Sequence, residues 1–372
     1  MTDSPPIKAG ALLSIDLDAL CDNWRSLRAR LPPGAGCAAV VKADAYGLGA
    51  ERVAPALYRA GCRDFFVAHV NEGIALRPTL PADASIHVLH GPHPGDEREC
   101  VRHRLVPVLN SLQQLKAWQT LARDLDTVLP AILQVDTGMA RLGLGPEDFD
   151  GLVSDSEALR GIALKFVMSH LASAEDQGSP VNALQLKRFR EVLAHLPGVR
   201  GSLANSSGIF LGDDYHFDLV RPGAALYGVA PVAGQPNPMR PVIRLQGKVL
   251  QTRHIAAGTS VGYAHTWTAQ RPSHIATVAV GYADGYLRSL SNRGIASCDG
   301  VPLPLIGNIS MDTLIVDITD TPEGRIAEGG LLDLANPWHG VDAIAARAGT
   351  IGYEILTSLG QRYARHYVGD GE

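Results

Sequence analysis

The sequence predicts an α/β protein in which a (β/α)8 barrel of the TIM type is followed by a mostly β C-terminal domain. Three observations support this fold class. From residue 11 to about residue 230, short apolar runs rich in valine and isoleucine alternate with segments of helical periodicity. Near residue 231 the composition changes, and strand-like runs joined by turns follow. The chain of 372 residues is also longer than most single hydrophobic cores, so two domains are expected.

Eight apolar runs in the first region have the length and composition of strands. In chain order they are GCAAVVKA, FFVAHV, IHVLH, LVPVLN, AILQVDT, IALKFVMSH, GSLANSS and FDLVRPG. Helical periodicity is visible between them, for example in residues 182–196, which place Leu184, Phe189, Val192 and Leu196 near one face. Eight strands alternating with helices predict a closed barrel, and an open doubly wound sheet is the weaker alternative.

A linker separates the two predicted domains. Residues 231–241, PVAGQPNPMRP, are rich in proline, glycine and asparagine. We therefore expect a barrel over residues 11–235 and a β-rich domain over residues 241–372. The run ALLSIDL at residues 11–17 could pair with the second domain rather than with the barrel.

The composition excludes several classes of function. A net charge of -5 and a pI of about 6.2 do not favour binding to nucleic acid or to an anionic membrane, because proteins that bind either usually have a basic face. Five scattered cysteines without a CxxC pair argue against a disulfide framework and against structural zinc. There is no HExxH motif, no P-loop and no pair of metal carboxylates, so no metal site is expected. The start of the sequence does not resemble a secretory signal, and no apolar run has membrane-spanning length, so a soluble cytoplasmic protein is expected.

Polar side chains follow the predicted barrel strands at the ends where barrel enzymes place their active sites. These residues are Lys42, Arg141, His170, the pair Asn205 and Ser206, and Arg221. Because the carboxyl ends of parallel barrel strands meet at one rim, we expect these side chains to converge there. That rim is the predicted active site.

Lys42 ends the first predicted strand and is followed by Tyr46, Gly47 and Gly49. Partial desolvation lowers the pKa of such a lysine and frees its amine to form a Schiff base with an aldehyde cofactor such as pyridoxal phosphate. Glycines allow a close approach of backbone to phosphate, and a tyrosine hydroxyl can donate to it. A lysine that extends its ammonium into solvent is the commoner alternative for any lone lysine.

Two further stretches, SLANSSGIFLG and VRPGAALYG, follow the seventh and eighth predicted strands with small residues. Backbone N–H groups there, together with the Ser206 hydroxyl, suit a phosphate, and barrels commonly bind phosphate at this place. An ordinary turn with a helix cap is an equally good explanation of either stretch alone. Arg221 could face the nitrogen of a pyridine ring and keep it unprotonated, which suits proton removal and return at Cα. A surface salt bridge is the alternative for Arg221.

In the second domain, Tyr263 lies in a turn after Gly262. A tyrosine can act as a proton donor or acceptor when its neighbours lower its pKa. Taken singly, Tyr263, Tyr282 and Tyr353 are as well explained as packing residues.

Several motifs taken together resemble the alanine racemase family, which is pyridoxal phosphate-dependent and of fold-type III. The motifs are AVVKADAYGLG, QVDTGMARLG, SHLASAED, ANSSG, VRPGAALYG, GYADG, NISMD and GYEILTSLGQR. They occur in family order from about residue 12 to residue 365. The resemblance implies the predicted barrel plus β domain, and it implies an enzyme that interconverts L-alanine and D-alanine.

The resemblance also implies the role of each matching residue. Lys42 would hold pyridoxal phosphate and act as the base for the D-enantiomer, while Tyr263 would act on the opposite face for the L-enantiomer. In the family this tyrosine comes from the partner subunit of a homodimer, so each site is completed in trans. The implied cofactor contacts are Tyr46, Asn205, Ser206, Gly223, Ala224 and Tyr353, with Arg221 at the pyridine nitrogen and His170 between Arg221 and Tyr263. Arg141 and the backbone of Met311 would bind the substrate carboxylate.

Two positions depart from the family pattern. Gln134 occupies the position of a lysine that is often carbamylated and orients the substrate-binding arginine, so Arg141 would be held by a neutral amide or by an anion such as chloride. We hypothesise an altered substrate affinity, and a Gln134→Lys variant with unchanged kinetics for every amino acid would contradict this. Ser310 stands where many members have cysteine, and we expect a mild effect.

Three other functions are alternatives to alanine racemase. A broad-specificity or serine racemase of the same fold is the nearest, and Gln134 keeps it open. Basic amino-acid decarboxylases share the fold but pair the pyridine nitrogen with an acid, which Arg221 argues against. A non-catalytic pyridoxal phosphate carrier would not need Tyr263 or Met311. D-alanine for peptidoglycan is the expected purpose, although alanine catabolism uses the same chemistry.

Overall fold

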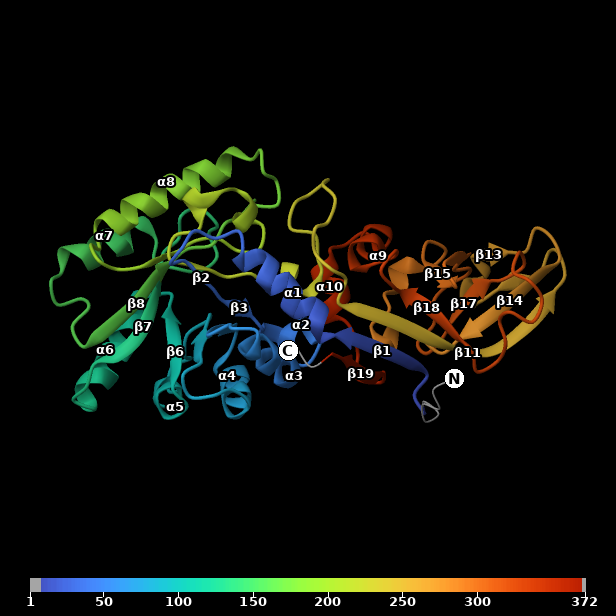
Figure 1. The fold of residues 1–372 in the computed structure, drawn as a ribbon, viewed down its shortest axis with the longest axis horizontal. Coiled ribbons are helices and arrows are strands. Elements are labelled where there is room, and N and C mark those ends of the chain that lie inside the picture. Colours follow the sequence, from blue (N-terminus) through green and yellow to red (C-terminus); the bar gives the residue numbers. More distant parts are fainter. Residues whose placement is uncertain (1–7, 370–372) are drawn as a thin grey trace. The chain divides into compact units, whose positions relative to one another are not determined.

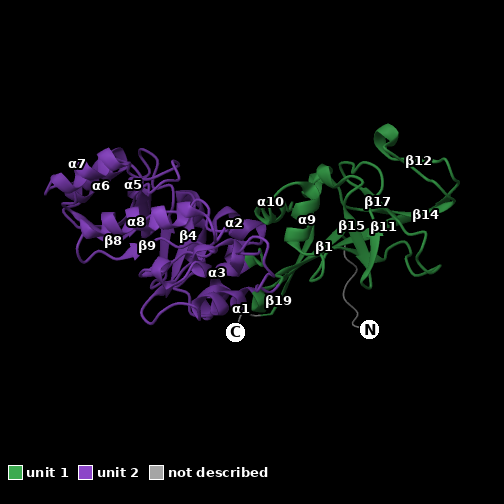
Figure 2. Ribbon diagram, turned by 90° about the horizontal axis from the view of Figure 1, so that it is seen from above, with its two compact units in different colours: residues 1–19, 227–229, 241–370 green, residues 20–226, 230–240, 371–372 purple. Residues whose placement is uncertain are grey.

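The computed structural model describes residues 8–369 and divides into two units, one of which contains a series of parallel strands (Figures 1 and 2). This barrel unit comprises residues 20–226 and 230–240. The β unit comprises residues 8–19, 227–229 and 241–369 of the described part. The sequence start that bears on a secretory signal and the final three residues of the predicted second domain lie outside the described residues.

Seven strands of the barrel unit form one hydrogen-bonded series in chain order. They are β3 (Ala39–Val40), β4 (Asp64–Val67), β5 (Ser85–Val88), β6 (Leu105–Leu109), β7 (Leu129–Gln134), β8 (Ile162–Met168) and β9 (Gly201–Ser202). Every neighbouring pair is parallel. The buried residues of these strands, such as Phe65, Ile86 and Leu133, form the centre of this unit.

The eighth strand position closes the ring. Strand β10 (Leu219–Val220) pairs in parallel with β2 (Gly36–Cys37), and β2 runs into β3 after a single residue. On the other side, the Arg221 N–H donates to the carbonyl of Ala204, just beyond β9. The predicted eight-stranded parallel barrel is therefore confirmed, with each strand at its predicted place in the sequence.

Helices connect the strands, and most strand-to-strand segments contain at least one. These helices are α2 (Lys42–Gly47), α3 (Ala50–Arg59), α4 (Val70–Leu76), α5 (Glu97–Arg102), α6 (Leu112–Asp124), α7 (Pro146–Ser154) and α8 (Pro180–Ala194), and α1 (Leu17–Arg28) precedes the ring. After β9 and β10 the chain forms only short 3-10 turns, η2 (Gly208–Phe210), η3 (Asp213–Tyr215) and η4 (Ala224–Tyr227). These short turns keep backbone N–H groups close to the strand ends.

Helix α8 shows where the predicted helical face was wrong. Leu184 is 46% exposed, whereas Phe189 is fully buried as expected. The buried residues of α8 are Asn182, Gln185, Leu186 and Phe189, which have the i, i+3, i+4, i+7 spacing of one helical face. A polar residue, Gln185, occupies the inward position, and this shifts the buried face by one residue from the one that leucines alone indicate.

The β unit contains a mixed sheet with the order β16-β15-β18-β11-β1-β19, and β14 joins it through β11 and pairs with β17. Its strands are β1 (Ala11–Asp16), β11 (Ile243–Ile255), β14 (Ser273–Val278), β15 (Ile295–Cys298), β16 (Val301–Pro304), β17 (Leu314–Asp317), β18 (Leu331–Ala335) and β19 (Ala364–Val368). A hairpin of β12 (Ser260–Val261) and β13 (Trp267–Thr268) and two helices, α9 (Val341–Ala348) and α10 (Gly352–Thr357), complete the unit. The predicted mostly β second domain is confirmed.

Strand β1 precedes the barrel in sequence but belongs to the sheet of the β unit. It pairs antiparallel with β11 and parallel with β19. Its burial alternates along the strand, with Leu13 and Ile15 fully buried. This alternation is what a strand in a sheet covered on one face requires. Among the described residues, no helix has both the length and the apolar character that a membrane crossing would need.

Candidate active site

Lys42 stands at the end of β3, at the start of an unusual turn. The four residues after it, 43–46, have φ between 53° and 55°, so they form a left-handed turn without glycine. Each such residue costs about 1 kcal/mol or more, and a run of four requires strong support from its surroundings. Gly47 and Gly49 follow with positive φ at no steric cost.

Burial lowers the pKa of Lys42 from its ordinary value, and the charge of Arg141 lowers it further, while the carboxylate of Glu72 opposes both. A lower pKa increases the fraction of neutral amine at physiological pH. Neutral amine is the form that attacks an aldehyde. The environment of Lys42 therefore suits covalent attachment of an aldehyde cofactor.

A cradle of small residues and hydroxyls lies close to this turn. The Ser206 hydroxyl oxygen accepts hydrogen bonds from the N–H groups of Gly223 at 3.0 Å and Ala225 at 3.2 Å. Its own proton remains available for donation. A Cβ on Gly223 would lie 2.4 Å from the Tyr46 hydroxyl, so a side chain at this position would force the buried tyrosine to move. Asn205 shapes the same turn by accepting the Gly208 N–H at 2.9 Å.

This cradle fits the phosphate of pyridoxal phosphate. It offers hydroxyl donors and close backbone rather than apolar side chains, as a phosphate requires. Lys42 provides the amine for the aldehyde, and a buried arginine is available for the ring nitrogen. The donor set of the barrel unit is therefore chemically suited to this cofactor.

Arg221 is that arginine, and it follows β10 in a buried position. Its guanidinium donates to the Ser202 hydroxyl at 2.5 Å and to the Ser169 carbonyl at 2.6 Å. These acceptors are uncharged, and burial lowers the pKa of Arg221 to about 9. The cation is thus held by neutral dipoles, and it remains protonated near neutral pH. A ring nitrogen that accepts from it would stay unprotonated.

His170 follows β8 and lies against Arg221, with the guanidinium 3.5 Å from its Nδ1. Burial lowers the pKa of His170 to about 3, with the charges of Arg221, Arg141 and Lys42 acting in the same direction. His170 is therefore neutral at physiological pH. Its carbonyl accepts a hydrogen bond from Gln185 at 2.9 Å, which fixes the backbone at the end of the strand.

Arg141 is carried by the loop that follows β7. The carboxylate of Asp136 accepts the N–H groups of Gly138, Met139 and Ala140 at 2.8–3.2 Å and so shapes the loop. Burial raises the pKa of Asp136, but these three hydrogen bonds outweigh it and the pKa is lowered. The Arg141 side chain is exposed, and its charge acts on Lys42 and His170.

Gln134 supports the same loop from inside the barrel. Its side chain is 6% exposed, and its amide donates to the carbonyl of Leu142 at 3.1 Å. Within residues 8–369 no hydrogen bond joins Gln134 to the Arg141 guanidinium. The neutral amide therefore acts on the backbone beside the arginine rather than on the arginine itself.

The other predicted site residues lie in the β unit. Tyr263 is 73% exposed, in a turn whose next two residues, Ala264 and His265, have φ of 59° and 48°. Asn308 donates to the carbonyl of Tyr263 at 2.9 Å, which brings this turn against the segment that carries Met311. Met311 is 53% exposed, and Arg362 anchors the adjoining residue Asp312 at 2.8 Å.

Tyr353 lies in the first turn of α10 and is 40% exposed. The structure thus brings together Tyr263 and Met311 in the β unit. In the barrel unit it brings together a second set, namely Lys42, Tyr46, Arg141, His170, Asn205, Ser206, Arg221, Gly223 and Ala224.

Sequence reasoning did not find three residues that support this site. Ser202 accepts from Arg221, Gln185 joins the ends of β7 and β8, and Glu72 contacts the turn after Lys42. The first two are buried polar residues whose partners lie far away in sequence. The only local signal was for Glu72, which stands three residues after His69, where a glutamate caps a helix.

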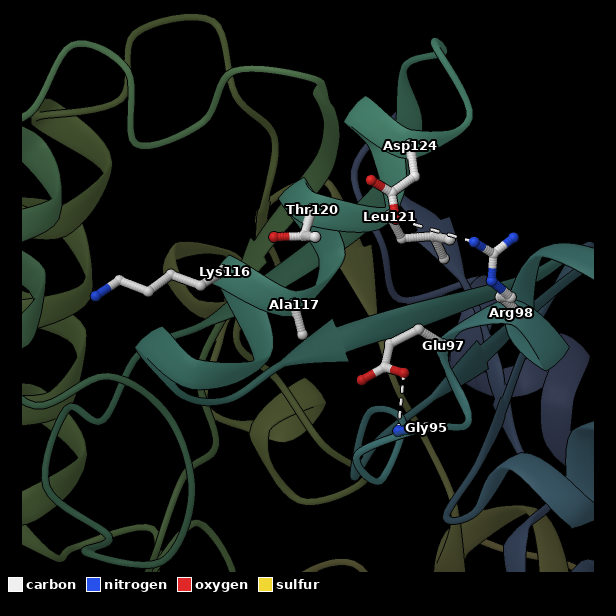
Figure 3. A pocket seen from close by; sticks show the side chains of 8 residues that line it. All are labelled: Gly95, Glu97, Arg98, Lys116, Ala117, Thr120, Leu121 and Asp124. Carbon is white, nitrogen blue, oxygen red and sulfur yellow. Dashed lines mark hydrogen bonds and ion pairs between the residues drawn. The ribbon is translucent and has the colours of Figure 1, made fainter.

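Two of the pockets in the described residues are lined by none of the predicted site residues. One of them, of about 440 Å³, lies between α5 and α6, where Arg98 and Asp124 form an ion pair at 3.9 Å; Figure 3 shows its lining side chains. Lys116 extends away from this pair, and no predicted site residue lines the pocket. The other, of about 420 Å³, lies beside α7 and α8 and is lined by Asp136 and Phe149 among others. Neither pocket is lined by Lys42, Arg141 or Arg221.

Comparisons with known proteins agree with this geometry. The family descriptions "Alanine racemase, N-terminal domain" and "Alanine racemase, C-terminal domain" match residues 15–231 and 242–367. The chain is 52% identical over 362 residues to an alanine racemase of Rhodospirillum rubrum, covering 97% of both chains. It is also 52% identical to a protein of Mesorhizobium japonicum named "Alanine racemase, catabolic", covering 97% of this chain and 94% of the relative.

Solved structures give the same result. The alanine racemase of Bartonella henselae with covalently bound pyridoxal phosphate superposes with a TM-score of 0.93 at 44% identity, covering 97% of this chain and all of that one. The alanine racemase of Streptomyces coelicolor superposes with a TM-score of 0.90 at 36% identity, covering 96% and 98%. A parallel barrel with a lysine of lowered pKa at a strand end, followed by a β unit, defines a class of pyridoxal phosphate-dependent enzymes. Within that class, the chain belongs to the alanine racemase family.

Proposed function

We propose that this protein is an alanine racemase that interconverts L-alanine and D-alanine with pyridoxal phosphate attached to Lys42. The proposal rests on 52% identity to a curated alanine racemase over 97% of both chains. The lowered pKa of Lys42, caused first by burial and then by Arg141, provides the matching chemistry at the barrel rim. Pyridoxal phosphate, when bound, supplies an electron sink that makes removal of the proton from the substrate Cα feasible.

Racemisation requires two proton-transfer groups, because the proton must return to the face opposite the one from which it was removed. Lys42 is assigned to one face, for the D-enantiomer, and Tyr263 to the other, for the L-enantiomer. An amine with a lowered pKa can accept and return a proton near neutral pH. A tyrosine hydroxyl becomes competent for the same task when cations lie near it.

Arg221 and His170 are assigned to the electrostatics of the site. Arg221 remains protonated and is held by neutral acceptors, so it disfavours a second positive charge on the ring nitrogen it would face. His170 remains neutral beside Arg221. We assign it a hydrogen bond to the Tyr263 hydroxyl, which would link that hydroxyl to the positive charge of Arg221. This arrangement favours simple proton removal and return over chemistry that needs a stronger electron sink.

Substrate binding is assigned to Arg141 and to the backbone N–H of Met311. An arginine recognises a carboxylate through paired N–H donors, and a backbone N–H adds a directional contact. The cofactor phosphate is assigned to Tyr46, Asn205, Ser206, Gly223, Ala224 and Tyr353. The Ser206 and Gly223 contacts described above support this assignment for the barrel part.

We further propose a homodimer in which the Tyr263 turn of one subunit serves the barrel of the other. A tyrosine that is 73% exposed, next to a methionine that is 53% exposed, suits a surface that another subunit covers. Sedimentation of the purified protein tests this, because a monomer with full activity would contradict completion in trans.

For the cellular setting we propose a cytoplasmic enzyme that provides D-alanine for peptidoglycan. A catabolic enzyme has the same chemistry, and two of the relatives are named catabolic. Deletion of the gene separates the two: a requirement for added D-alanine supports the biosynthetic role, and loss of growth on alanine alone supports the catabolic one.

The first experiment is incubation of the purified protein with L-alanine and pyridoxal phosphate, followed by chiral chromatography. L-serine and L-lysine are assayed in parallel. Rapid formation of D-alanine with little product from the others is the expected result. Faster turnover of serine or lysine would replace the proposal with a broad-specificity racemase, and no turnover of any of them would leave a carrier.

A further inference from the structure

The Glu72 carboxylate joins two strand ends of the barrel. One of its oxygens accepts the N–H of Ala43 at 2.7 Å, directly after Lys42. The other accepts the N–H groups of Ala68 at 2.6 Å and His69 at 3.1 Å, at the end of β4. Glu72 itself lies in the first turn of α4 and is half-buried.

Capping of its own helix explains only part of this arrangement. A glutamate at this position caps a helix by accepting the N–H of the residue three before it, here His69. That function needs one oxygen. The second oxygen reaches Ala43, on a different strand end, and this contact contributes nothing to the cap of α4.

Ala43 is the first residue of the left-handed turn 43–46. A turn of four residues without glycine in this conformation persists only where neighbouring groups hold it. The contact from Glu72 is a charge-assisted hydrogen bond, which is stronger than one between neutral groups. It acts at the residue where the chain leaves the extended strand, and so at the base of Lys42.

We propose that Glu72 is a positioning residue for Lys42, holding the left-handed turn that aims the lysine amine at the barrel mouth. This inference rests on the proposed function of Lys42. The carboxylate also acts on Lys42 through its charge, against the opposing charge of Arg141. Two further titratable groups at this rim, His90 and His170, are influenced by Lys42 and belong to the same electrostatic environment.

Two variants separate positioning from capping. Glu72→Asp keeps the charge and can cap α4, but its shorter side chain does not reach Ala43. Glu72→Gln keeps the length but has a single acceptor oxygen and no charge, so an amide NH₂ faces one of the N–H donors. Glu51→Gln is the matched control, because Glu51 is an exposed acid in the first turn of the neighbouring helix α3.

The test has two readouts in the full-length protein. The first is hydrogen exchange of the peptide covering residues 41–48 in the cofactor-free protein, where both Glu72 variants should exchange at least tenfold faster than wild type. The second is the rate of covalent pyridoxal phosphate attachment, followed by absorbance, which should fall about tenfold or more in both variants. Glu51→Gln should match wild type in both.

The outcomes distinguish this inference from the proposed function. Wild-type exchange and attachment rates in folded Glu72→Asp and Glu72→Gln proteins would overturn the positioning role. If Glu72→Gln does not fold, Glu72→Asp alone decides, because it retains the helix cap. If wild type itself does not react with pyridoxal phosphate, the proposed function fails, while hydrogen exchange still tests whether Glu72 holds the turn.

Discussion

The Arg221 guanidinium lies 3.5 Å from Nδ1 of His170, and this contact determines which proton the imidazole can hold. Arginine only donates, so Nδ1 must be the acceptor. His170 is therefore a neutral ring whose only N–H is on Nε2. Burial and three nearby cations, Arg221, Arg141 and Lys42, lower its pKa to about 3 and maintain this state. A residue that would be a pH sensor elsewhere is fixed in one form here.

Acid stability should depend on His170. Its pKa is about 3 in the folded protein and 6.5 in the unfolded chain, so only the unfolded chain binds a proton between these values. Stability is then lost as pH falls from 6.5, by about 3 kcal/mol at pH 4 from this group. Urea unfolding at both pH values should show a smaller loss in His170→Gln, while the exposed His195→Gln control behaves as wild type. Equal losses in all three proteins would contradict the burial of His170.

Removal of the Tyr263 hydroxyl should slow racemisation strongly without affecting the fold. Because the side chain is 73% exposed, we expect Tyr263→Phe to change stability by less than about 0.5 kcal/mol. Loss of a proton-transfer group costs about 10²–10⁴-fold in rate. D-alanine formation, pyridoxal phosphate binding and the melting temperature are measured together, with Tyr215→Phe as control. An active Tyr263→Phe enzyme would remove this residue from the mechanism.

Gly223 should be intolerant of a side chain. An alanine Cβ would lie 2.4 Å from the Tyr46 hydroxyl and 3.3 Å from Val40, so the buried tyrosine must move. Overpacking of this kind costs about 1–3 kcal/mol. We expect Gly223→Ala to weaken pyridoxal phosphate binding about tenfold, which corresponds to about 1.4 kcal/mol and lies within this range. Equilibrium titration measures this, and Gly145→Ala, where nothing lies within 4 Å of a new Cβ, is the control.

Gln134 should control substrate affinity through the loop that carries Arg141. Its amide donates to the Leu142 carbonyl, and a bond of this kind contributes about 1 kcal/mol. Gln134→Ala should therefore raise KM for alanine about fivefold, with a smaller change in kcat. Gln119→Ala is the matched control, because Gln119 also donates to backbone carbonyls, those of Glu157 and Ala158, but far from this loop in sequence. An unchanged KM would mean that the loop keeps its shape without Gln134.

The barrel could be predicted from the sequence because the pattern that indicates each strand lies within a few consecutive residues. Each strand is a short apolar run. The residues that end the runs, such as Lys42, His170 and Arg221, are polar or charged, and such groups are unusual beside a buried strand. The position of these residues relative to the strand ends followed from one rule about barrels. Tyr263 and Met311 had no such local signal and depended on resemblance to a family.

The supporting residues could not be predicted, because their function depends on distant partners. Gln185 on α8 contacts Thr137 and the carbonyl of His170, and nothing near position 185 indicates either. The left-handed turn after Lys42 was also invisible, because alanine, aspartate and tyrosine have no preference for that conformation over ordinary helix. The exposed Leu184 illustrates the reverse error, in which an apolar residue was assigned to a face that a buried glutamine occupies.

The pairing of β1 with β19 has a consequence for synthesis on the ribosome. Strand β1 is made before the barrel, but its neighbours β11 and β19 are completed only after the entire barrel sequence has emerged. The barrel can fold while translation continues, whereas the β unit waits for β19 at residues 364–368, which follow the whole barrel sequence. A nascent chain that stalls shortly before that point carries a finished barrel and a sheet with an open edge along β1, which is the kind of surface that chaperones and proteases recognise.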